Sequence, residues 1–253
     1  MTLAPAGPFR LDDRVFGLLT GLVEDYAGIR FDAPRKEFVA ERLGRRVAAL
    51  GLPGFLDYYY HLKYDPDGRD ELQRAVEELT VNETYFFREA GPLEALLDSW
   101  LPRREETARV WSVACSTGAE PYTLAILAEE RGVADRLEIW ASDIDRGALA
   151  AAERAVYSDG ALRMTPPERR DRWFERTGEG WRLKDPPRGR VRFFWANALA
   201  PGEAAAEGRW DAILCRNLLI YFSDETTRKL VATLHRALRP GGVLLLGLTE
   251  SLL

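Results

Sequence analysis

The sequence has very few of the side chains that bind metals or form disulfides. Its 253 residues include two cysteines and two histidines. Cys115 and Cys215 lie in apolar runs without the spacing of a zinc site or a disulfide framework, and His61 and His235 each stand alone. We therefore predict no metal site, and cysteines that stay reduced in a cytosolic environment.

Long apolar runs and an excess of positive charge are also missing. No stretch of about 18 apolar residues is present, and the start, MTLAPAGPFRLDD, lacks the apolar core of a signal peptide. The net charge of −5 and the pI of about 5.3 argue against a nucleic-acid partner, which usually requires a basic face. We expect a cytoplasmic protein without direct membrane insertion. Its 46% hydrophobic residues are enough for a substantial core.

Residues 1–80 are predicted to form a helical subdomain. Apolar residues recur at helical spacing in DDRVFGLLTGLVEDYAG. PRKEFVAERLGRRVAALG begins with Pro34 and ends with Gly51, residues typical of helix starts and ends. Two further helical stretches follow, and residues 81–108 are predicted to be a linker that contributes to a ligand pocket.

From residue 109 onward, short apolar runs alternate with helical stretches. The strand-like runs are ARVWSVACSTG, RLEIWASDID, GRVRFFWANAL, WDAILCRNLLIYF and VLLLGLTESLL. This alternation predicts an α/β fold with a parallel, doubly wound sheet over 109–253. The charged, proline-rich interval 160–190 breaks the alternation, and we predict a small antiparallel β insert at about 173–192.

The first predicted strand leads into a loop of small residues, SVACSTGAEP. Ala114, Ser116 and Gly118 allow a ligand to approach the backbone closely, although the loop is not the G-x-G-x-x-G of dinucleotide enzymes. Asp143 ends the second strand, where a carboxylate accepts both hydroxyls of a ribose. The alternative is a tight strand–helix turn with Asp143 as a helix N-cap.

Polar residues also follow two later strands. Arg216 and Asn217 end an apolar run, with Tyr221 close behind, and Asn197 ends another. Polar side chains are costly to bury without partners, and the carboxyl ends of parallel strands meet at one edge of a sheet. We therefore predict a single ligand crevice. The alternative is that Asn217 caps a turn and Tyr221 lies in the core.

Together these segments resemble the CheR-type chemotaxis receptor methyltransferases over nearly the whole chain. VNETYFFRE resembles the family's N-x-T-x-F-F-R-E, and WDAILCRNLLIYF its F-D-x-I-F-C-R-N-V-x-I-Y-F. VWSVACSTGAEPYTLA, ASDIDRGALAAAERAVY and LRPGGVLLLGLTESL resemble further family segments. The family uses S-adenosylmethionine (SAM) to esterify glutamates on receptors, leaving S-adenosylhomocysteine. The resemblance implies a protein-glutamate O-methyltransferase with a Rossmann-like fold, which acts on the cytoplasmic helical region of chemoreceptors.

The resemblance also assigns site residues. The family's cofactor contacts fall on Asn82, Thr84, Arg88, Ala114, Glu120, Asp143, Asn197, Ala198, Arg216 and Asn217. In that picture Asp143 holds the ribose, and Glu120 and Arg88 lie near the methionyl end. The candidate catalytic residues are Arg88, which pairs with the acceptor carboxylate or that of the cofactor, and Tyr221, which orients the acceptor. Both have structural alternatives, because Arg88 could simply reach solvent and Tyr221 could belong to the core.

The sequence departs from the family pattern at two positions. Ala119 stands where the family's S-T-G-E-E has its first Glu, which leaves Glu120 as the residue expected to face the ligand. Leu248 stands where the closing G-H-S-E has its His, and nothing in the sequence explains this change.

Receptor binding is predicted on the helix over 35–49. Arg42, Arg45 and Arg46 project roughly opposite its apolar stripe, and related proteins use basic residues here to hold acidic receptor helices. The alternative is a solvated helix face. The short predicted hairpin argues against dependence on a receptor tether peptide, and we expect a monomer.

Two other classes of function would require different residues. A nucleic-acid methyltransferase should carry an Asn/Asp-Pro-Pro-aromatic motif at the fourth strand, where this chain has RNLLIY. A non-catalytic SAM-sensing or scaffold protein would keep Asp143 but lose Arg88 or Tyr221, and both are present.

Overall fold

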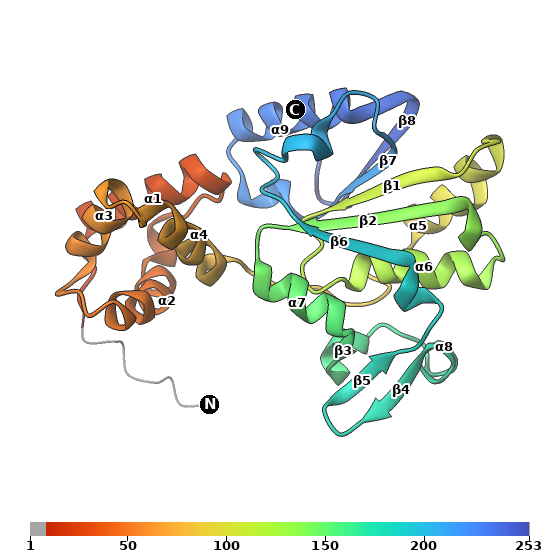
Figure 1. Cartoon of the computed structure of the whole chain (residues 1–253), viewed down its shortest axis with the longest axis horizontal. Helices are drawn as coiled ribbons and strands as arrows, with labels where there is room; N and C mark the ends of the chain where they lie inside the picture. Colours follow the sequence, from red (N-terminus) through yellow and green to blue (C-terminus); the bar gives the residue numbers. More distant parts are fainter. Residues whose placement is uncertain (1–8, 253) are drawn as a thin grey trace. The chain divides into compact units, whose positions relative to one another are not determined.

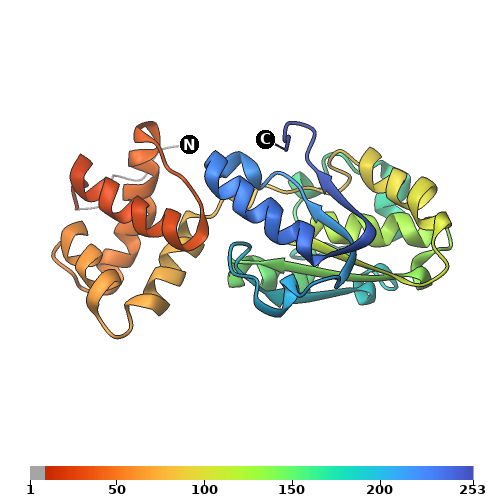
Figure 2. The ribbon, with the colours of Figure 1, turned by 90° about the horizontal axis from the view of Figure 1, so that it is seen from above.

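The computed structural model describes residues 9–252, which form two compact units (Figures 1 and 2). The first unit contains the described residues up to Val81 together with Tyr221–Ser223. The second contains Asn82–Ile220 and the described residues from Asp224 onward. None of the helices formed by residues 9–252 is long and apolar enough to cross a membrane.

The first unit is helical, and its helices contact one another (Figure 2). Its elements are α1 (Asp13–Ala27), η1 (Ala33–Arg35), α2 (Lys36–Ala49), α3 (Phe55–Tyr64) and α4 (Gly68–Leu79). Asp12 begins α1 by accepting a hydrogen bond from the amide of Val15 at 2.8 Å. The apolar stripe of α2, at Val39, Leu43 and Val47, is fully buried, as its helical spacing predicts.

The second unit contains the predicted parallel sheet. Its strands are β1 (Ala108–Val113), β2 (Leu137–Asp143), β6 (Val191–Trp195), β7 (Trp210–Cys215) and β8 (Leu238–Leu246). They pair in parallel in the order β6-β2-β1-β7-β8. The doubly wound α/β fold is thus confirmed. The order reverses at β1, which has β2 on one side and β7 on the other, and open α/β sheets bind ligands at such a point.

Helices connect these strands and pack on the sheet. The helical elements are α5 (Gly91–Ala95), η2 (Leu96–Trp100), η3 (Leu101–Arg103), α6 (Ala119–Glu130), η4 (Ala134–Arg136), α7 (Arg146–Arg154), η5 (Asp159–Leu162), α8 (Pro167–Trp173), η6 (Pro187–Arg190), η7 (Gly202–Ala205), η8 (Leu219–Tyr221) and α9 (Asp224–Ala237). α6 and α7 contact β2 and β6, whereas α9 contacts β8. The helices α6 and α7 thus cover the β2–β6 side of the sheet, and α9 lies against the other edge strand.

A small antiparallel sheet interrupts the alternation, as predicted, and lies below α7 in the view of Figure 1. Its strands are β3 (Val156–Tyr157), β4 (Phe174–Thr177) and β5 (Gly180–Leu183), in the order β3-β5-β4. The insert is thus more than a hairpin, because β3 adds a third strand from before α8.

The aromatic residues before α5 anchor that segment in the core. Phe86 is fully buried, and its ring meets those of Tyr157 and Phe174 edge-on, with centroids 4.7 and 4.9 Å away. Such aromatic pairs contribute about 0.5–1.5 kcal/mol each beyond simple burial. The segment that carries Arg88 is therefore anchored by the buried aromatic ring of Phe86.

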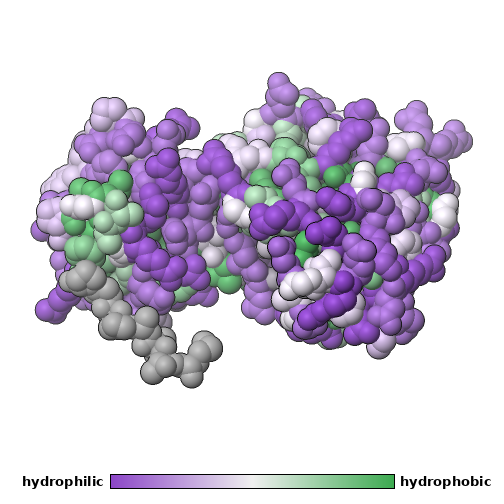
Figure 3. Space-filling view, turned by 60° about the horizontal axis from the view of Figure 1, so that its bottom comes forward, coloured by the Kyte–Doolittle hydropathy of each residue, from purple (hydrophilic) through white to green (hydrophobic). Residues whose placement is uncertain are grey.

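The face shown in Figure 3 is mainly hydrophilic, as 30% charged residues would lead one to expect.

Candidate active site

The loop between β1 and α6 has an unusual backbone. Ala114 and Ser116 have φ of 54° and 51°, and Gly118 has φ of 85°. A Cβ on Gly118 would lie 2.9 Å from the Cβ of Ala152, so a side chain there would push α7 away. Left-handed residues interspersed with ordinary ones turn backbone N–H groups into a shared concavity, which suits polar or anionic ligand groups.

Asp143, at the end of β2, is a buried carboxylate whose partners are backbone amides. It is 6% exposed and accepts hydrogen bonds from the amides of Ser116 at 2.7 Å and Asp145 at 2.9 Å. Burial raises the pKa of Asp143 to about 6, and the hydrogen bonds from the amides lower it only in part. Burying a carboxylate without a cation is costly, so this residue is a candidate for ligand binding.

Asn82 joins this loop to the next helix. Its Nδ2 donates to Asp145 Oδ2 at 2.6 Å, and its Oδ1 accepts from Ser116 Oγ at 2.8 Å. Asp145 Oδ1 in turn accepts the amide of Ala148 at 3.0 Å and caps α7. The N-cap is therefore Asp145, and the capping alternative for Asp143 is wrong.

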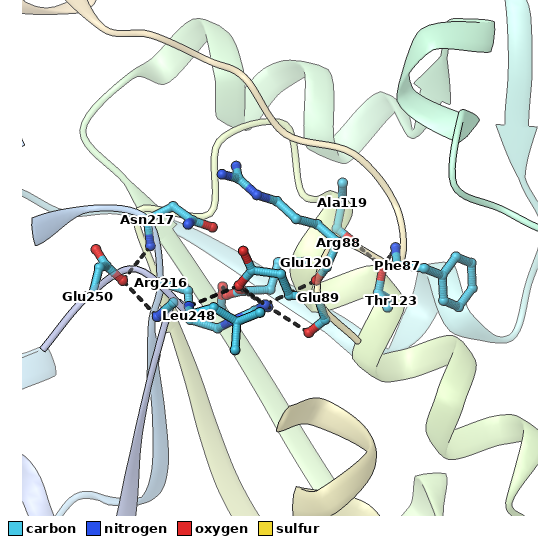
Figure 4. A network of polar contacts seen from close by, with 12 residues as sticks. Phe87, Arg88, Glu89, Ala119, Glu120, Thr123, Arg216, Asn217, Leu248 and Glu250 are labelled. Carbon is cyan, nitrogen blue, oxygen red and sulfur yellow. Dashed lines mark hydrogen bonds and ion pairs between the residues drawn. The ribbon is translucent and has the colours of Figure 1, made fainter. Parts of the chain in front are cut away.

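Arg216, after β7, is the centre of a second polar network (Figure 4). Its Nη1 donates to Glu120 Oε2 at 2.9 Å, and its Nη2 donates to Glu89 Oε2 at 3.2 Å. The same Nη2 also reaches the backbone carbonyls of Arg88 and Glu89, at 3.0 and 2.9 Å. The side chain is 1% exposed, and among residues 9–252 nothing partners its Nε.

Glu120, in the first turn of α6, is held by both of its oxygens. Oε1 accepts from Ser112 Oγ at 2.8 Å, and Oε2 accepts from Arg216. Burial raises the pKa of Glu120, while Arg216 and Ser112 oppose that rise. The carboxylate thus fixes the guanidinium between α6 and the segment that carries Glu89.

The loop after Arg216 is held by the carboxylate of Glu250. This carboxylate accepts from the amides of Asn217, Leu219 and Gly247, each at 2.7 Å. Asn217 has φ of 60°, in the left-handed region. The loops after β7 and β8 therefore meet the segment of Arg88 and Glu89, which hydrogen-bonds to Arg216 and to the amide of Leu248.

The sequence has clear relatives. A family model described as "CheR methyltransferase, SAM binding domain" matches residues 82–253, and one described as "CheR methyltransferase, all-alpha domain" matches residues 14–80. The chain belongs to the CheR methyltransferase family.

Three chemotaxis protein methyltransferases match most of this chain. A chemotaxis protein methyltransferase 2 from Vibrio cholerae is 38% identical over 234 residues, 89% of this chain and 81% of that protein. Chemotaxis protein methyltransferases from Klebsiella aerogenes and Escherichia coli are 39% and 36% identical over 247 residues. Each match covers 95% of this chain, with 84% and 85% of the respective relative. The chain is therefore a SAM-dependent chemotaxis methyltransferase.

The residues present fit SAM. The Asp143 carboxylate accepts two backbone amides of the neighbouring loops. Because a carboxylate offers about four lone-pair sites, it can also accept hydrogen bonds from ligand hydroxyls. Among residues 9–252, the buried Nε of Arg216 has no hydrogen-bond acceptor and could donate to a ligand. Asp143 would hold the ribose, and the Glu120–Arg216 side would hold the methionyl end.

Hydrogen bonds connect several of the residues that the CheR pattern assigns to the cofactor. Asn82 is linked to the loop of Ala114 and Asp143, and Glu120 is linked to Arg216. The loop after β6 lies beside Asp143, because the amide of Ala196 donates to the Asp143 carbonyl at 3.1 Å.

The remaining assigned residues lie in the adjoining loops. Asn197 is 6% exposed, and its Oδ1 accepts the amide of Leu199 at 3.0 Å, so its side chain shapes its own turn. Ala198 follows it, and Thr84 is half-buried before Phe86. The cofactor roles of these residues remain predictions.

The two catalytic candidates have different surroundings. Arg88 lies with its guanidinium 5.5 Å from the ring centroid of Tyr85, and its Nη1 donates to the Glu83 carbonyl at 3.2 Å. In the view of Figure 4 the side chain extends away from Phe87 above the Glu120–Arg216 pair. Tyr221 belongs to the first compact unit, and its carbonyl accepts the amide of Arg30 at 3.0 Å. Both catalytic roles stay predictions.

The three arginines predicted to bind the receptor differ in how firmly other side chains hold their guanidinium groups. Arg46 forms two hydrogen bonds to Glu71, at 2.8 and 2.7 Å, and Glu71 is 1% exposed. Its guanidinium is thus part of the helical core, a placement that the sequence pattern missed because Glu71 lies on another helix. Arg42 stacks 5.2 Å from the Phe38 ring centroid, and Arg45 is exposed and pairs with Glu41 at 3.0 Å.

Sequence reasoning did not assign roles to Glu89, Asp145 or Glu250. Each is nevertheless a member of a segment quoted for the family resemblance: FFRE, ASDID and GLTE. The acidic residue in each of these segments could have been noted as a candidate from the sequence. The hydrogen-bond partners of the three acids, however, depend on loops that only the fold brings together.

Proposed function

We propose that this chain transfers the methyl group of SAM to glutamate side chains in the cytoplasmic helical region of chemoreceptors. The products are glutamate methyl esters and S-adenosylhomocysteine, and the reaction serves adaptation in chemosensory signalling. The family and the curated relatives support the reaction. The observation that carries the site is the buried Asp143 carboxylate, which accepts backbone amides at the switch point of the sheet.

SAM, when bound, supplies an electrophilic methyl group on a sulfonium. An acceptor glutamate has an ordinary pKa of about 4.3, so it is already ionised at neutral pH and requires no general base. The protein's work is to align the carboxylate and exclude water. The chain's own residues are suited to this, since Glu120 and Arg216 are largely buried and fixed by several hydrogen bonds.

Arg88 is the residue that we assign to the acceptor carboxylate. Its guanidinium lies beside Tyr85 and, within the part of the chain that the structure describes, donates to one acceptor, the Glu83 carbonyl. A guanidinium has five N–H donors, so most of its capacity is left for a carboxylate. Tyr221 would orient the acceptor oxygen. Arg42 and Arg45 would contact the acidic receptor helices, and Arg46 would support them through its bond to Glu71.

The decisive experiment is transfer of radiolabelled methyl from SAM to a receptor cytoplasmic fragment. Counts released as volatile methanol by mild base identify a carboxyl ester, because N-methyl groups resist base. We expect base-labile transfer that an Arg88→Ala variant loses. SAM binding without transfer to several receptor fragments would instead support a SAM-sensing role.

Cellular setting and assembly are part of the same proposal. Because the methylated helices of chemoreceptors are cytoplasmic, we expect this enzyme in the cytoplasm. We also expect it to act as a monomer. Light scattering of the enzyme with and without receptor fragment tests the second statement, and a stable dimer would contradict it.

A further inference from the structure

We infer that Glu250 is a positioning residue, which holds the loop after β7 in the conformation needed for SAM binding. This inference rests on the proposed function, because it assumes that Arg216 and Asn217 face the cofactor. Glu250 lies four residues beyond the end of β8 at Leu246 and is not among the residues assigned to the cofactor.

Glu250 closes a loop-to-loop clamp with both carboxylate oxygens. Oε1 accepts the amide of Leu219, and Oε2 accepts the amides of Asn217 and Gly247, all at 2.7 Å. Hydrogen bonds from N–H to an ionised carboxylate are about twice as strong as neutral ones. One carboxylate therefore ties the exit of β7 to the exit of β8.

The clamp explains two backbone features. Asn217 has φ of 60°, which costs energy for a residue with a side chain and persists only when its surroundings enforce it. Gly247 fits the clamp because it lacks a side chain: an added Cβ would lie 2.8 Å from Glu250 Oε2 and 2.9 Å from Asn217 Nδ2, so these side-chain atoms would have to shift. The glycine thus lets the carboxylate come between the two loops.

A second bond holds the same loop from the other side. Glu89 Oε2 accepts the amide of Leu248 at 3.1 Å while it also accepts from Arg216 Nη2. The Leu248 side chain is 73% exposed, so the loop is held through its backbone and the residue's identity matters little. Glu250 and Glu89 together connect the end of β8 to Asn217 and Arg216.

The test combines amide exchange in the ligand-free enzyme with SAM affinity. In Glu250→Gln, an NH2 group replaces one acceptor oxygen and opposes an amide donor. We expect exchange at Asn217, Leu219 and Gly247 to speed up at least tenfold. We also expect the Kd and KM for SAM to rise about tenfold, with kcat at saturating SAM and KM for receptor fragment within about twofold of wild type.

Gly247→Ala is the second variant, because it disturbs the clamp without changing charge. It separates loop position from electrostatics and should weaken SAM binding to a similar extent. Matched controls are Glu225→Gln, an exposed acid on α9 paired with Lys229, and Gly178→Ala, whose added Cβ would meet nothing within 4 Å. Both controls should keep wild-type affinity.

Wild-type SAM affinity in the folded fraction of both Glu250→Gln and Gly247→Ala would overturn the inference, as would unchanged amide exchange. If Glu250→Gln does not fold, Gly247→Ala alone decides. Failure of the proposed function is distinguishable, since a wild-type chain that binds SAM but forms no methyl ester leaves these binding comparisons intact.

Discussion

The two ends of the parallel sheet each hold a buried carboxylate, and they treat it differently. At the amino end, Asp211 on β7 is fully buried and paired with the guanidinium groups of Arg104 and Arg239. It also accepts the amide of Arg109 at 2.9 Å. At the carboxyl end, Asp143 accepts backbone amides instead of cations. One charge is neutralised within the protein, and the other retains capacity for a ligand.

The backbone follows the same division. Among residues 9–252, five of the six non-glycine residues with positive φ lie in the loops around the candidate site: Phe87, Glu89, Ala114, Ser116 and Asn217. The sixth, Ala155, ends α7. Such conformations cost about 1–3 kcal/mol each and concentrate at functional sites. At the amino end the buried charge is thus used to stabilise the fold, whereas most of the backbone strain lies at the carboxyl end, around the candidate site.

The largest expected effect is a loss of stability when Asp211 is removed from its ion pairs with Arg104 and Arg239 at the amino end of the sheet. Asp211→Ala leaves two guanidinium groups without their carboxylate, and breaking a buried pair costs about 3–5 kcal/mol. Because Arg104 and Arg239 are 23% and 33% exposed, we expect about 3 kcal/mol. Thermal unfolding should begin roughly 6–12 °C lower, since about 1 kcal/mol shifts Tm by 2–4 °C at this size.

A matched control uses an exposed pair near the same end. Glu138 and Arg109 have side chains 42% and 47% exposed and meet at 3.2 Å. Glu138→Ala should change stability by less than about 0.5 kcal/mol, as exposed pairs do. The comparison of the sheet ends fails if Asp211→Ala lowers SAM affinity in the folded protein as strongly as it lowers Tm.

Asp143→Asn should produce the opposite pattern. The substitution removes a charged acceptor for the ribose hydroxyls, and hydrogen bonds to charged groups contribute about 1.5–3 kcal/mol each. We expect SAM to bind roughly 100-fold more weakly, measured by calorimetry. The Tm should fall less than in Asp211→Ala, because the Asn side chain keeps one oxygen acceptor and loses the hydrogen bond to only one of the two backbone amides. A large drop in Tm with normal affinity would show that Asp143 is a structural residue like Asp211.

The pH dependence of Asp143 sharpens the same contrast. Its pKa of about 6 lies above the ordinary 3.8, so the folded, ligand-free protein binds more protons than the unfolded chain between about pH 4 and 6. Its contribution to stability therefore falls as pH rises through that window. Ligand hydroxyls prefer the charged form, so SAM affinity should fall about tenfold per unit below about pH 6. Both trends should flatten in Asp143→Asn, and equal slopes in the two proteins would contradict the assignment.

The strand-end residues of the candidate site could be predicted from the sequence more readily than the residues that support them. Asp143 and Arg216 were predictable because each directly follows a buried apolar run, and such strand ends converge. Glu89 and Arg216 lie 127 residues apart, so their pairing depends on a fold that periodicity cannot supply. The same limit hid the bond from Arg46 to Glu71, and it made Asp143 rather than Asp145 look like the helix cap.

The smallest expected effect belongs to Arg45, which separates receptor binding from the stability of the helical unit. Its side chain is 56% exposed and pairs only along its own helix with Glu41, so its removal should change Tm little. Rim charges mainly affect association, and we expect Arg45→Ala to raise KM for receptor fragment about threefold without altering SAM affinity. Arg46→Ala, in contrast, removes two hydrogen bonds from the buried Glu71, which keeps only the longer bond to Arg74 and that to Tyr58 among the described residues, and should lower Tm together with receptor methylation. An Arg45→Ala variant with wild-type receptor KM at low salt would remove this arginine from the predicted receptor surface.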